Sequence, residues 1–242
     1  MMDFHSHVLP GMDDGSRSVE ESIGMLHQMA VQGVNRVAAT SHFYAFLESP
    51  ESFLSRRAEA AACLKEAMER EEGLPEIHLG AEVRYYEGMS RTEALHEMVI
   101  EGTRLLLLEM PFTAWNERML YEVRELEDNL CCTVLIAHIE RYLRFQRGQW
   151  FWHMLEEMHA LIQSNASFFI GRLSRPRALR LLTADRIHLL GSDSHNLDTR
   201  PPNLGAACDI ISRRLGAGAV RRIDERGENL LVHASERKDV FT

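Results

Sequence analysis

Residues 3–7 read Asp3-Phe4-His5-Ser6-His7, and this stretch sets both the expected fold and the expected chemistry. Side chains along a β-strand alternate between its two faces, so residues two positions apart point the same way. His5 and His7 therefore direct two imidazoles toward one point, and histidine is the commonest metal ligand near neutral pH. The same spacing recurs far along the chain in Asp193-Ser194-His195. The two pairs together predict a metal site built from distant parts of the sequence.

Short apolar runs typical of buried strands alternate with amphipathic helical patterns along the chain. This alternation predicts parallel strands joined by right-handed helical crossovers. Seven such units favour an α/β fold, a distorted seven-stranded (β/α)7 TIM-like barrel, formed as a single domain over residues 1–242. The predicted strands are Met2–His5, Val34–Thr40, Ile77–Glu82, Arg104–Met110, Thr133–His138, Ser167–Gly171 and Ile187–Asp193.

Capping residues mark where the helices begin and end. Ser18 precedes an apolar periodicity that ends at Gly33, and Ser49-Pro50 begins a second one that ends at Gly73. The capping-box pattern of residues 90–93 predicts the start of a third helix. Further helices are predicted over residues 115–129, 148–163, 176–185 and 203–215.

Composition excludes several classes of function. The net charge of −9 disfavours a nucleic-acid partner, because phosphate backbones select basic surfaces. No apolar run is long enough to cross a bilayer, and the first residues lack the pattern of a signal peptide. The four cysteines form no C-x-x-C pair. We therefore expect a cytoplasmic protein that is not embedded in a membrane.

Functional side chains of barrels gather at the carboxyl ends of the strands. Six of the seven predicted strands end on or just before a His, Asp or Glu, which scattered polar residues would not do. Imidazole and carboxylate ligands without cysteine suit Zn²⁺, Mn²⁺ or Fe, and the number of ligands exceeds what one ion uses. The candidate metal ligands are His5, His7, Asp14, His42, Glu82, Glu109, His138, Asp193 and His195.

Each candidate taken alone has an ordinary structural explanation. A carboxylate such as Glu109 can cap a helix or form an ion pair, and a histidine such as His42 can be a hydrogen-bonded core residue. Asp13 fits a loop or cap residue better than a ligand. His78 shares its strand face with Glu82, yet we assign it to the core. The metal site is favoured by the common position of the whole set at the strand ends.

Several motifs of the chain together resemble the polymerase-and-histidinol-phosphatase (PHP) superfamily. Within it they resemble the bacterial tyrosine-protein phosphatases encoded with capsule and exopolysaccharide systems. The resemblance covers residues 1–205 or so. It is carried by residues 3–7, Met12-Asp13-Asp14-Gly15, Thr40-Ser41-His42, Gly80-Ala81-Glu82, Ala137-His138-Ile139-Glu140-Arg141-Tyr142, and Ser192-Asp193-Ser194-His195-Asn196 with Arg200-Pro201-Pro202.

The resemblance implies a distorted barrel with three metal ions, usually manganese, with Fe, Zn or Mg as alternatives. One ion would be held by His5, His7, Glu82 and Asp193, a second by Glu82, Glu109 and His138, and a third by Asp14, His42 and His195. Arg141 and Arg200 would bind the phosphate. In the mechanism we expect, His42, His195 or water on the third metal would protonate the leaving group. The expected reaction is attack by metal-activated hydroxide on a phosphotyrosine protein, an autophosphorylated bacterial tyrosine kinase.

Three alternatives stay open at this point. The same cluster could cleave a small phosphomonoester such as histidinol phosphate, or stabilise a subunit without catalytic activity. The run from Cys208 to Arg214 fits the C-x5-R spacing of cysteine phosphatases, although it lacks a glycine-bearing loop. The aromatic stretch Phe43-Tyr44-Ala45-Phe46 departs from the family, which often has basic or polar residues there. The segment 168–172 departs as well, because it is more apolar than usual. Both departures concern the substrate more than the chemistry.

Overall fold

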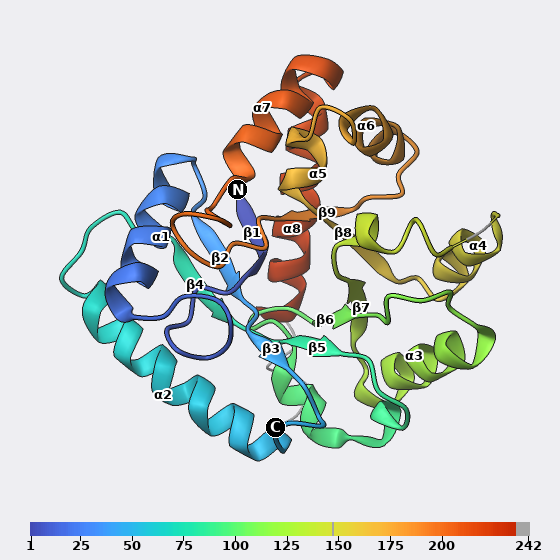
Figure 1. Ribbon diagram of the computed structural model, residues 1–242, viewed down its shortest axis with the longest axis horizontal. Helices are drawn as coiled ribbons and strands as arrows, with labels where there is room; N and C mark the ends of the chain where they lie inside the picture. The colour runs from blue at the N-terminus through green and yellow to red at the C-terminus, as the bar shows by residue number, and fades with distance from the viewer. Residues whose placement is uncertain (147, 236–242) are drawn as a thin grey trace.

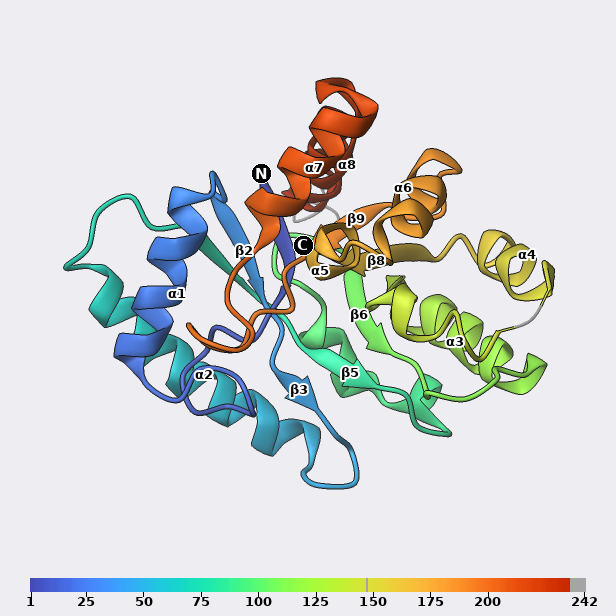
Figure 2. The ribbon, with the colours of Figure 1, turned by 45° about the horizontal axis from the view of Figure 1, so that its top comes forward.

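Parallel strands form a curled sheet with helices around its outer side, in a mixed α/β architecture (Figures 1 and 2). The computed structural model describes residues 1–146 and 148–235. All strand pairs within these residues are parallel. The strands are β1 (Met2–Ser6), β2 (Arg36–Ala39), β3 (His42–Phe43), β4 (Glu76–Leu79), β5 (Glu82–Arg84), β6 (Leu105–Glu109), β7 (Thr133–Ile136), β8 (Leu161–Asn165) and β9 (Leu189–Gly191).

The helices begin largely where the capping residues predict. Ser18 accepts a hydrogen bond from the backbone N–H of Glu21, and Ser49 accepts one from Ser52, so both predicted caps are confirmed. The capping box at residues 90–93 is wrong, because this segment forms two 3₁₀ turns and no α-helix. The helices are α1 (Val19–Val31), α2 (Pro50–Met68), η1 (Met89–Arg91), η2 (Glu93–Met98), α3 (Glu117–Leu130), η3 (Ile139–Arg141), α4 (Trp150–Glu157), α5 (Ala166–Ile170), α6 (Arg175–Thr183), α7 (Leu204–Leu215) and α8 (Ala217–Ser235).

Two breaks in the strands shape the sheet. The strand order is β1-β2-β4 in one sheet and β3-β5-β6-β7-β8-β9 in the other. Residues 40–41 separate β2 from β3, and residues 80–81 separate β4 from β5. The other ends of the two sheets also meet, because His7 donates its backbone N–H to Ser194 at 2.9 Å. Glu82 and His42 therefore begin short strands, and the prediction that Glu82 ends a strand is wrong.

The sixth predicted strand is also wrong. Residues 167–171, predicted as a strand, fall mainly in the short helix α5, whose Phe168 and Phe169 are buried. The strand at this place in the sheet is β8, which lies partly inside the segment predicted as a helix over 148–163. Tertiary packing decides both cases, because a short apolar run fits a buried helix as well as a strand.

A separate, smaller apolar cluster lies between the strands and the last helix. Phe4, Leu107 and Leu135 belong to it, and Leu230 and Leu231 of α8 pack against it. Each fully buried leucine contributes about 1.5–3 kcal/mol relative to an exposed one. The sequence patterns did not predict α8, which lies beside β9 and behind the strands in Figure 1 and packs against this cluster. No helix in the described part of the chain has both the length and the apolar character needed to cross a bilayer.

Candidate metal centre

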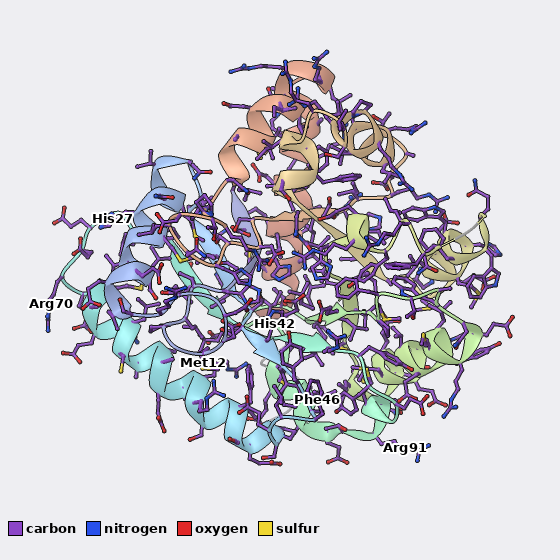
Figure 3. The ribbon with its side chains drawn as sticks, viewed as in Figure 1. Met12, His27, His42, Phe46, Arg70 and Arg91 are labelled. Carbon is purple, nitrogen blue, oxygen red and sulfur yellow. The ribbon has the colours of Figure 1, made fainter. Side chains whose placement is uncertain are left out.

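Imidazole and carboxyl groups from both sheets meet around the carboxyl ends of β1, β6, β7 and β9. Most of these groups are buried, whereas His42 lies at the edge and the side chain of Asp14 is 65% exposed. Figure 3 shows His42 near the middle of the molecule. The structure brings together all nine candidate ligands: His5, His7, Asp14, His42, Glu82, Glu109, His138, Asp193 and His195.

The first group is formed by two histidines and two carboxylates. Nε2 of His5 and Nε2 of His7 lie 3.2 Å apart, and Oε2 of Glu82 lies 3.1 and 3.3 Å from them. Oδ1 of Asp193 lies 3.6 and 3.5 Å from the same two nitrogens. Ligand atoms about 2.1 Å from one ion stand about 3 Å from one another. The four atoms therefore have the spacing of a single cation site.

Glu82 also faces a second group through its other oxygen. Oε1 of Glu82 lies 2.8 Å from Nε2 of His138, and the same nitrogen is 3.6 Å from Oε1 of Glu109. Nδ1 of His42 is 3.0 Å from Oε2 of Glu82. The position of Glu82 between the two groups is the one a bridging carboxylate needs.

The third group lies toward solvent. Oδ1 of Asp14 is 3.3 Å from Nε2 of His195 and 3.6 Å from Nε2 of His42. The ring of His195 lies 3.8 Å from the ring of His7, so this group adjoins the first one. Because Asp14 is the exposed member, a substrate can approach the cluster from this side.

The alignment of these groups fits cations better than hydrogen bonds. Nε2 of His195 and Nδ1 of His42 are buried and have no hydrogen-bond partner among the described residues, although carboxylate oxygens lie 3.3 and 3.0 Å away. Buried polar atoms rarely stay unpaired. In a hydrogen bond the donor N–H points at the acceptor oxygen. Two ligands of one metal ion instead both point their lone pairs at the ion, so they lie close together without that geometry. The donor set therefore fits divalent metal ions.

The charges of the cluster point the same way. Burial would raise the pKa of Glu82, but the charge of His5 and the hydrogen bond from His138 hold this pKa well below its ordinary value. Burial and the negative charge of Glu82 raise the pKa of Glu109. Two carboxylates thus compete for ionisation in one buried pocket, and bound cations would relieve this repulsion.

Two arginines close the cluster beside Asp193. Arg141 contacts Oδ2 of Asp193, and Arg200 donates a hydrogen bond to Oδ1 at 2.7 Å. Arg141 ends the 3₁₀ turn that follows His138, and the backbone carbonyl of Arg200 accepts a hydrogen bond from His195 at 2.9 Å. Both side chains are more than one third exposed, so their guanidinium groups can meet an incoming anion.

The sequence patterns missed the residues that orient the ligands. Oε1 of Gln163 lies 3.4 Å from Nδ1 of His5, and Oδ2 of Asp13 lies 2.7 Å from Nδ1 of His7. A hydrogen atom on Nδ1 leaves the lone pair on Nε2, which is the nitrogen that faces the centre of the first group. Asp13 also accepts a hydrogen bond from the backbone of Gly15, as a loop residue does.

Strand β8 carries a row of buried polar side chains although it contains no candidate ligand. Gln163 accepts a hydrogen bond from the backbone N–H of His138 at 2.6 Å and donates one to Asn165 at 3.0 Å. Asn165 donates in turn to Oδ2 of Asp193 at 2.7 Å. One strand thus fixes ligands from several neighbouring segments. The burial of these polar residues is set by tertiary packing, so the local sequence did not reveal their role.

Replacing Gln163 with Leu tests this positioning role. We expect metal affinity and turnover to fall about 10–100-fold, because the variant frees the ring of His5 and leaves the backbone N–H of His138 without its acceptor. The control is Gln146→Leu, since Gln146 bridges Thr113 and Trp115 without touching a candidate ligand. Metal titration, turnover and thermal unfolding in chelator are measured on both. Unchanged metal affinity in Gln163→Leu contradicts the role.

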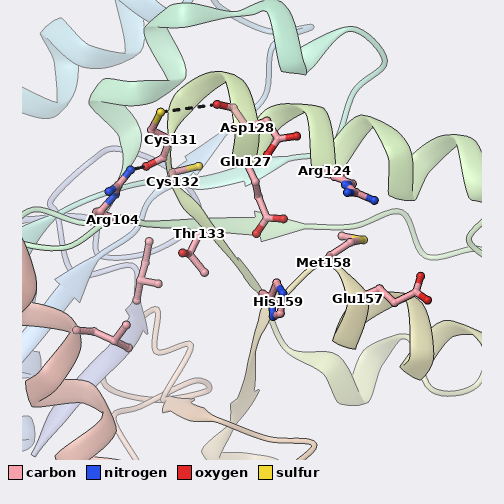
Figure 4. Close-up of a pocket in the computed structure, with 12 residues that line it drawn as sticks. Arg104, Arg124, Glu127, Asp128, Cys131, Cys132, Thr133, Glu157, Met158 and His159 are labelled. Carbon is pink, nitrogen blue, oxygen red and sulfur yellow. Dashed lines mark hydrogen bonds between the residues drawn. The ribbon is translucent and has the colours of Figure 1, made fainter.

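A cavity at the opposite ends of the strands is separate from this centre. It has a volume of about 630 Å³ and is lined by residues that include Arg104, Glu127, Cys132 and His159 (Figure 4). Burial raises the pKa of Glu127 to about 7 and that of Cys132 to about 12. None of the nine candidate ligands lines it.

Two residues considered from the sequence lie outside the centre. Cys208 sits within the helix α7, whose interior amides are bonded along the helix and cannot wrap a phosphate. Burial raises the pKa of the Cys208 thiol to about 12, which makes it a poor nucleophile. His78 lies 3.0 Å from the backbone carbonyl of Glu101 and belongs to none of the ligand groups.

Comparison with known proteins gives consistent matches over most of the chain. The family described as "Capsular polysaccharide synthesis, CpsB/CapC" matches residues 1–232. Tyrosine-protein phosphatase CpsB of Streptococcus pneumoniae is 30% identical over 233 residues, which cover 92% of this chain and 94% of the relative. Tyrosine-protein phosphatase YwqE of Bacillus subtilis (strain 168) is 27% identical over 238 residues, which cover 96% and 91%. A crystal structure from work on YwqE and CpsB, described as "unique metal-dependent tyrosine phosphatases", matches with a TM-score of 0.81 at 26% identity, over 96% of this chain and 94% of that one.

Proposed function

The chain belongs to the CpsB/CapC family of capsular polysaccharide synthesis, and we propose on this basis that it is a metal-dependent protein-tyrosine phosphatase. The relatives it matches are named tyrosine-protein phosphatases. The observation that carries the proposal is the contact of one carboxylate, Glu82, with four imidazoles at 2.8–3.3 Å. Such a cluster supplies the ligands of a multinuclear hydrolase.

The candidate ligands divide into three sets, two of which share Glu82. His5, His7, Glu82 and Asp193 would hold one ion. Glu109 and His138 would complete a second with Glu82, and Asp14, His42 and His195 would hold the third. The spacing within each set supports three ions per chain, and manganese is the metal we propose, with Fe, Zn or Mg as alternatives.

The protein groups around these ions have separate tasks in the reaction. When bound, divalent ions lower the pKa of water and stabilise the attacking and leaving oxygens of an in-line displacement. Arg141 and Arg200 hold the phosphoryl oxygens with paired N–H donors. His42 and His195, on the solvent side of the cluster, stand where a proton can reach the departing phenolate oxygen. The buried side chains of β8 keep the ligand nitrogens aimed at the centre.

The finer architecture is part of the proposal. We take β2 with β3, and β4 with β5, as two interrupted strands, which gives a seven-stranded distorted barrel. The hydrogen bonds from Glu82 N–H to the carbonyls of Thr40 and Ser41, at 3.2 and 3.0 Å, support this count. The whole of residues 1–242 would form one domain, of which residue 147 and residues 236–242 lie outside the described part. The substrate would be a phosphotyrosine protein, a bacterial tyrosine kinase of the same system, met in the cytoplasm.

Chelation against thiol alkylation tests the reaction class. We expect EDTA to remove nearly all hydrolysis of a phosphotyrosine peptide and Mn²⁺ to restore it, whereas iodoacetamide leaves turnover in place. The cysteines Cys63 and Cys131 are exposed, so alkylation reaches thiols without reaching the cluster. Loss of turnover with iodoacetamide but not with EDTA would reject the metal mechanism. Faster hydrolysis of histidinol phosphate than of the peptide, on the same sample, would support the small-substrate alternative.

A further inference from the structure

A row of aromatic rings leads from the candidate metal centre to the surface. The ring of Tyr44 stacks on His42, with centroids 5.0 Å apart and planes at 23°. The ring of Phe46 follows Tyr44 at 5.5 Å and 34°. All three residues lie at or just after β3, in a connection that projects beyond the sheet toward α2 (Figures 2 and 3). The row therefore starts at a ligand and ends in solvent.

The outer end of this row exposes apolar surface. Phe46 is 76% exposed and the adjacent Leu47 is 68% exposed. Phe43 is fully buried against Phe53, at a ring distance of 5.4 Å, and anchors the segment in the core. A single exposed apolar residue is ordinary on a protein surface, but a contiguous pair beside a polar site is typical of a binding surface.

A second aromatic ring stands next to the cluster on another element. Phe112 stacks on His138, with centroids 6.1 Å apart, and on Tyr142 at 5.5 Å. Tyr44 and Phe112 thus flank different candidate ligands of one cluster. Planar side chains at this entrance suit the ring of an aryl phosphate, because aromatic pairs prefer stacked or edge-to-face contact.

A cavity joins Leu47, one of the two exposed apolar residues, to the third ligand group. Its volume is about 310 Å³, and Met12, Asp14, His42, Tyr44 and Leu47 are among the residues that line it. This volume lies at the lower end of the range for small-molecule sites, roughly 300–1,000 Å³. It therefore suits a single amino-acid side chain that enters next to the phosphorylated residue.

We propose that Tyr44, Phe46 and Leu47 form a docking surface for an apolar residue adjacent to the phosphotyrosine of an extended protein segment. The inference rests on the proposed function and adds to it a contact with the residue beside the phosphotyrosine. A small phosphomonoester binds through its phosphate at the metal ions and has no neighbouring residue that could reach Phe46 and Leu47. Phe46 and Leu47 gain apolar contact only when the phosphorylated ring is part of a longer chain. The surface therefore favours phosphoproteins over small phosphomonoesters.

The variant Phe46→Ala/Leu47→Ala tests the docking surface with three probes. These are a phosphotyrosine peptide with leucine next to the phosphorylated residue, the same peptide with serine there, and p-nitrophenyl phosphate. We expect kcat/KM for the leucine peptide to fall about ten-fold through KM, and that for p-nitrophenyl phosphate to change less than about two-fold. The control is Val31→Ala, which alters a 90% exposed residue at the far end of α1 and should affect neither peptide.

The outcomes separate this inference from the proposed function. Equal hydrolysis of both peptides by the unaltered protein, or equal losses for peptide and p-nitrophenyl phosphate in the double variant, overturns the docking surface and leaves the phosphatase in place. Absence of hydrolysis of all three probes by the metal-loaded, unaltered protein overturns the proposed function itself.

Discussion

Replacing Glu82 with Gln should lower turnover by at least about 10³-fold, the scale on which a single preorganised electrostatic group acts in an enzyme. The carboxylate lies 2.8–3.3 Å from imidazole nitrogens of four histidines and belongs to two of the three ligand sets. Glutamine keeps the size of the side chain but removes its charge and turns N–H donors toward the other ligands. We therefore expect the variant to bind fewer ions than the unaltered protein.

The matched control is Glu76→Gln. Glu76 begins β4, which leads toward Glu82, but its side chain is 66% exposed and far from the ligand groups. Metal content by plasma mass spectrometry and kcat for a phosphotyrosine peptide are measured on both variants. If Glu82→Gln kept its full metal content and its turnover, Glu82 would have no bridging role.

Replacing Arg141 or Arg200 with Lys should lower kcat/KM on the order of 10²-fold while metal content stays unchanged. Lysine keeps the positive charge but presents one ammonium group in place of a planar fork of N–H donors. Arg141 contacts one carboxylate oxygen of Asp193 and Arg200 contacts the other, and both arginine side chains remain more than one third exposed. Because guanidinium groups do not ligate cations, the loss should concern the phosphate and not the metal.

The control for this pair is Arg118→Lys, which alters an exposed arginine that pairs with Glu87 on the surface. It should change neither kcat/KM nor thermal stability, since exposed ion pairs contribute about 0–1 kcal/mol. Equal kinetics for Arg141→Lys and Arg118→Lys would remove Arg141 from the phosphate site. A parallel loss of bound metal would instead assign it to the support of Asp193.

Most of the candidate ligands could be grouped from the sequence because they interrupt or end an apolar segment. His138 follows the apolar run of β7, and Glu109 closes the apolar strand β6. Parallel strands bring such ends to one side of the sheet, so local patterns carried information about distant contacts. The same reasoning placed Glu82 at a strand end, although the chain breaks at residues 80–81 and begins β5 with it.

Strand β8 could not be recognised, and the reason is physical. A strand buried on both faces normally consists of apolar residues, but β8 ends with Gln163, Ser164 and Asn165, all buried. Gln163 and Asn165 support neighbouring candidate ligands through hydrogen bonds that no local pattern reveals. The apolar run of α5, which follows directly, offered a better strand by composition. Local rules fail most often where residues serve a site.

The aromatic segment after β3 shows a different limit. The sequence showed that Tyr44 and Phe46 are aromatic, but not that they stack in a row from His42 while Phe43 turns into the core. Alternation along an extended chain explains the opposite directions of neighbouring residues. Which of them faces solvent depends on the α2 helix that covers Phe43.

Anomalous diffraction at the manganese edge, from crystals of the full chain grown with Mn²⁺, tests the central claim most directly. We predict three peaks per chain around Glu82, spaced about 3.5–4 Å apart, with imidazole nitrogens and carboxylate oxygens at about 2.0–2.2 Å. A map without bound ions among His5, His138 and His195, from protein that still hydrolyses phosphotyrosine, would contradict it.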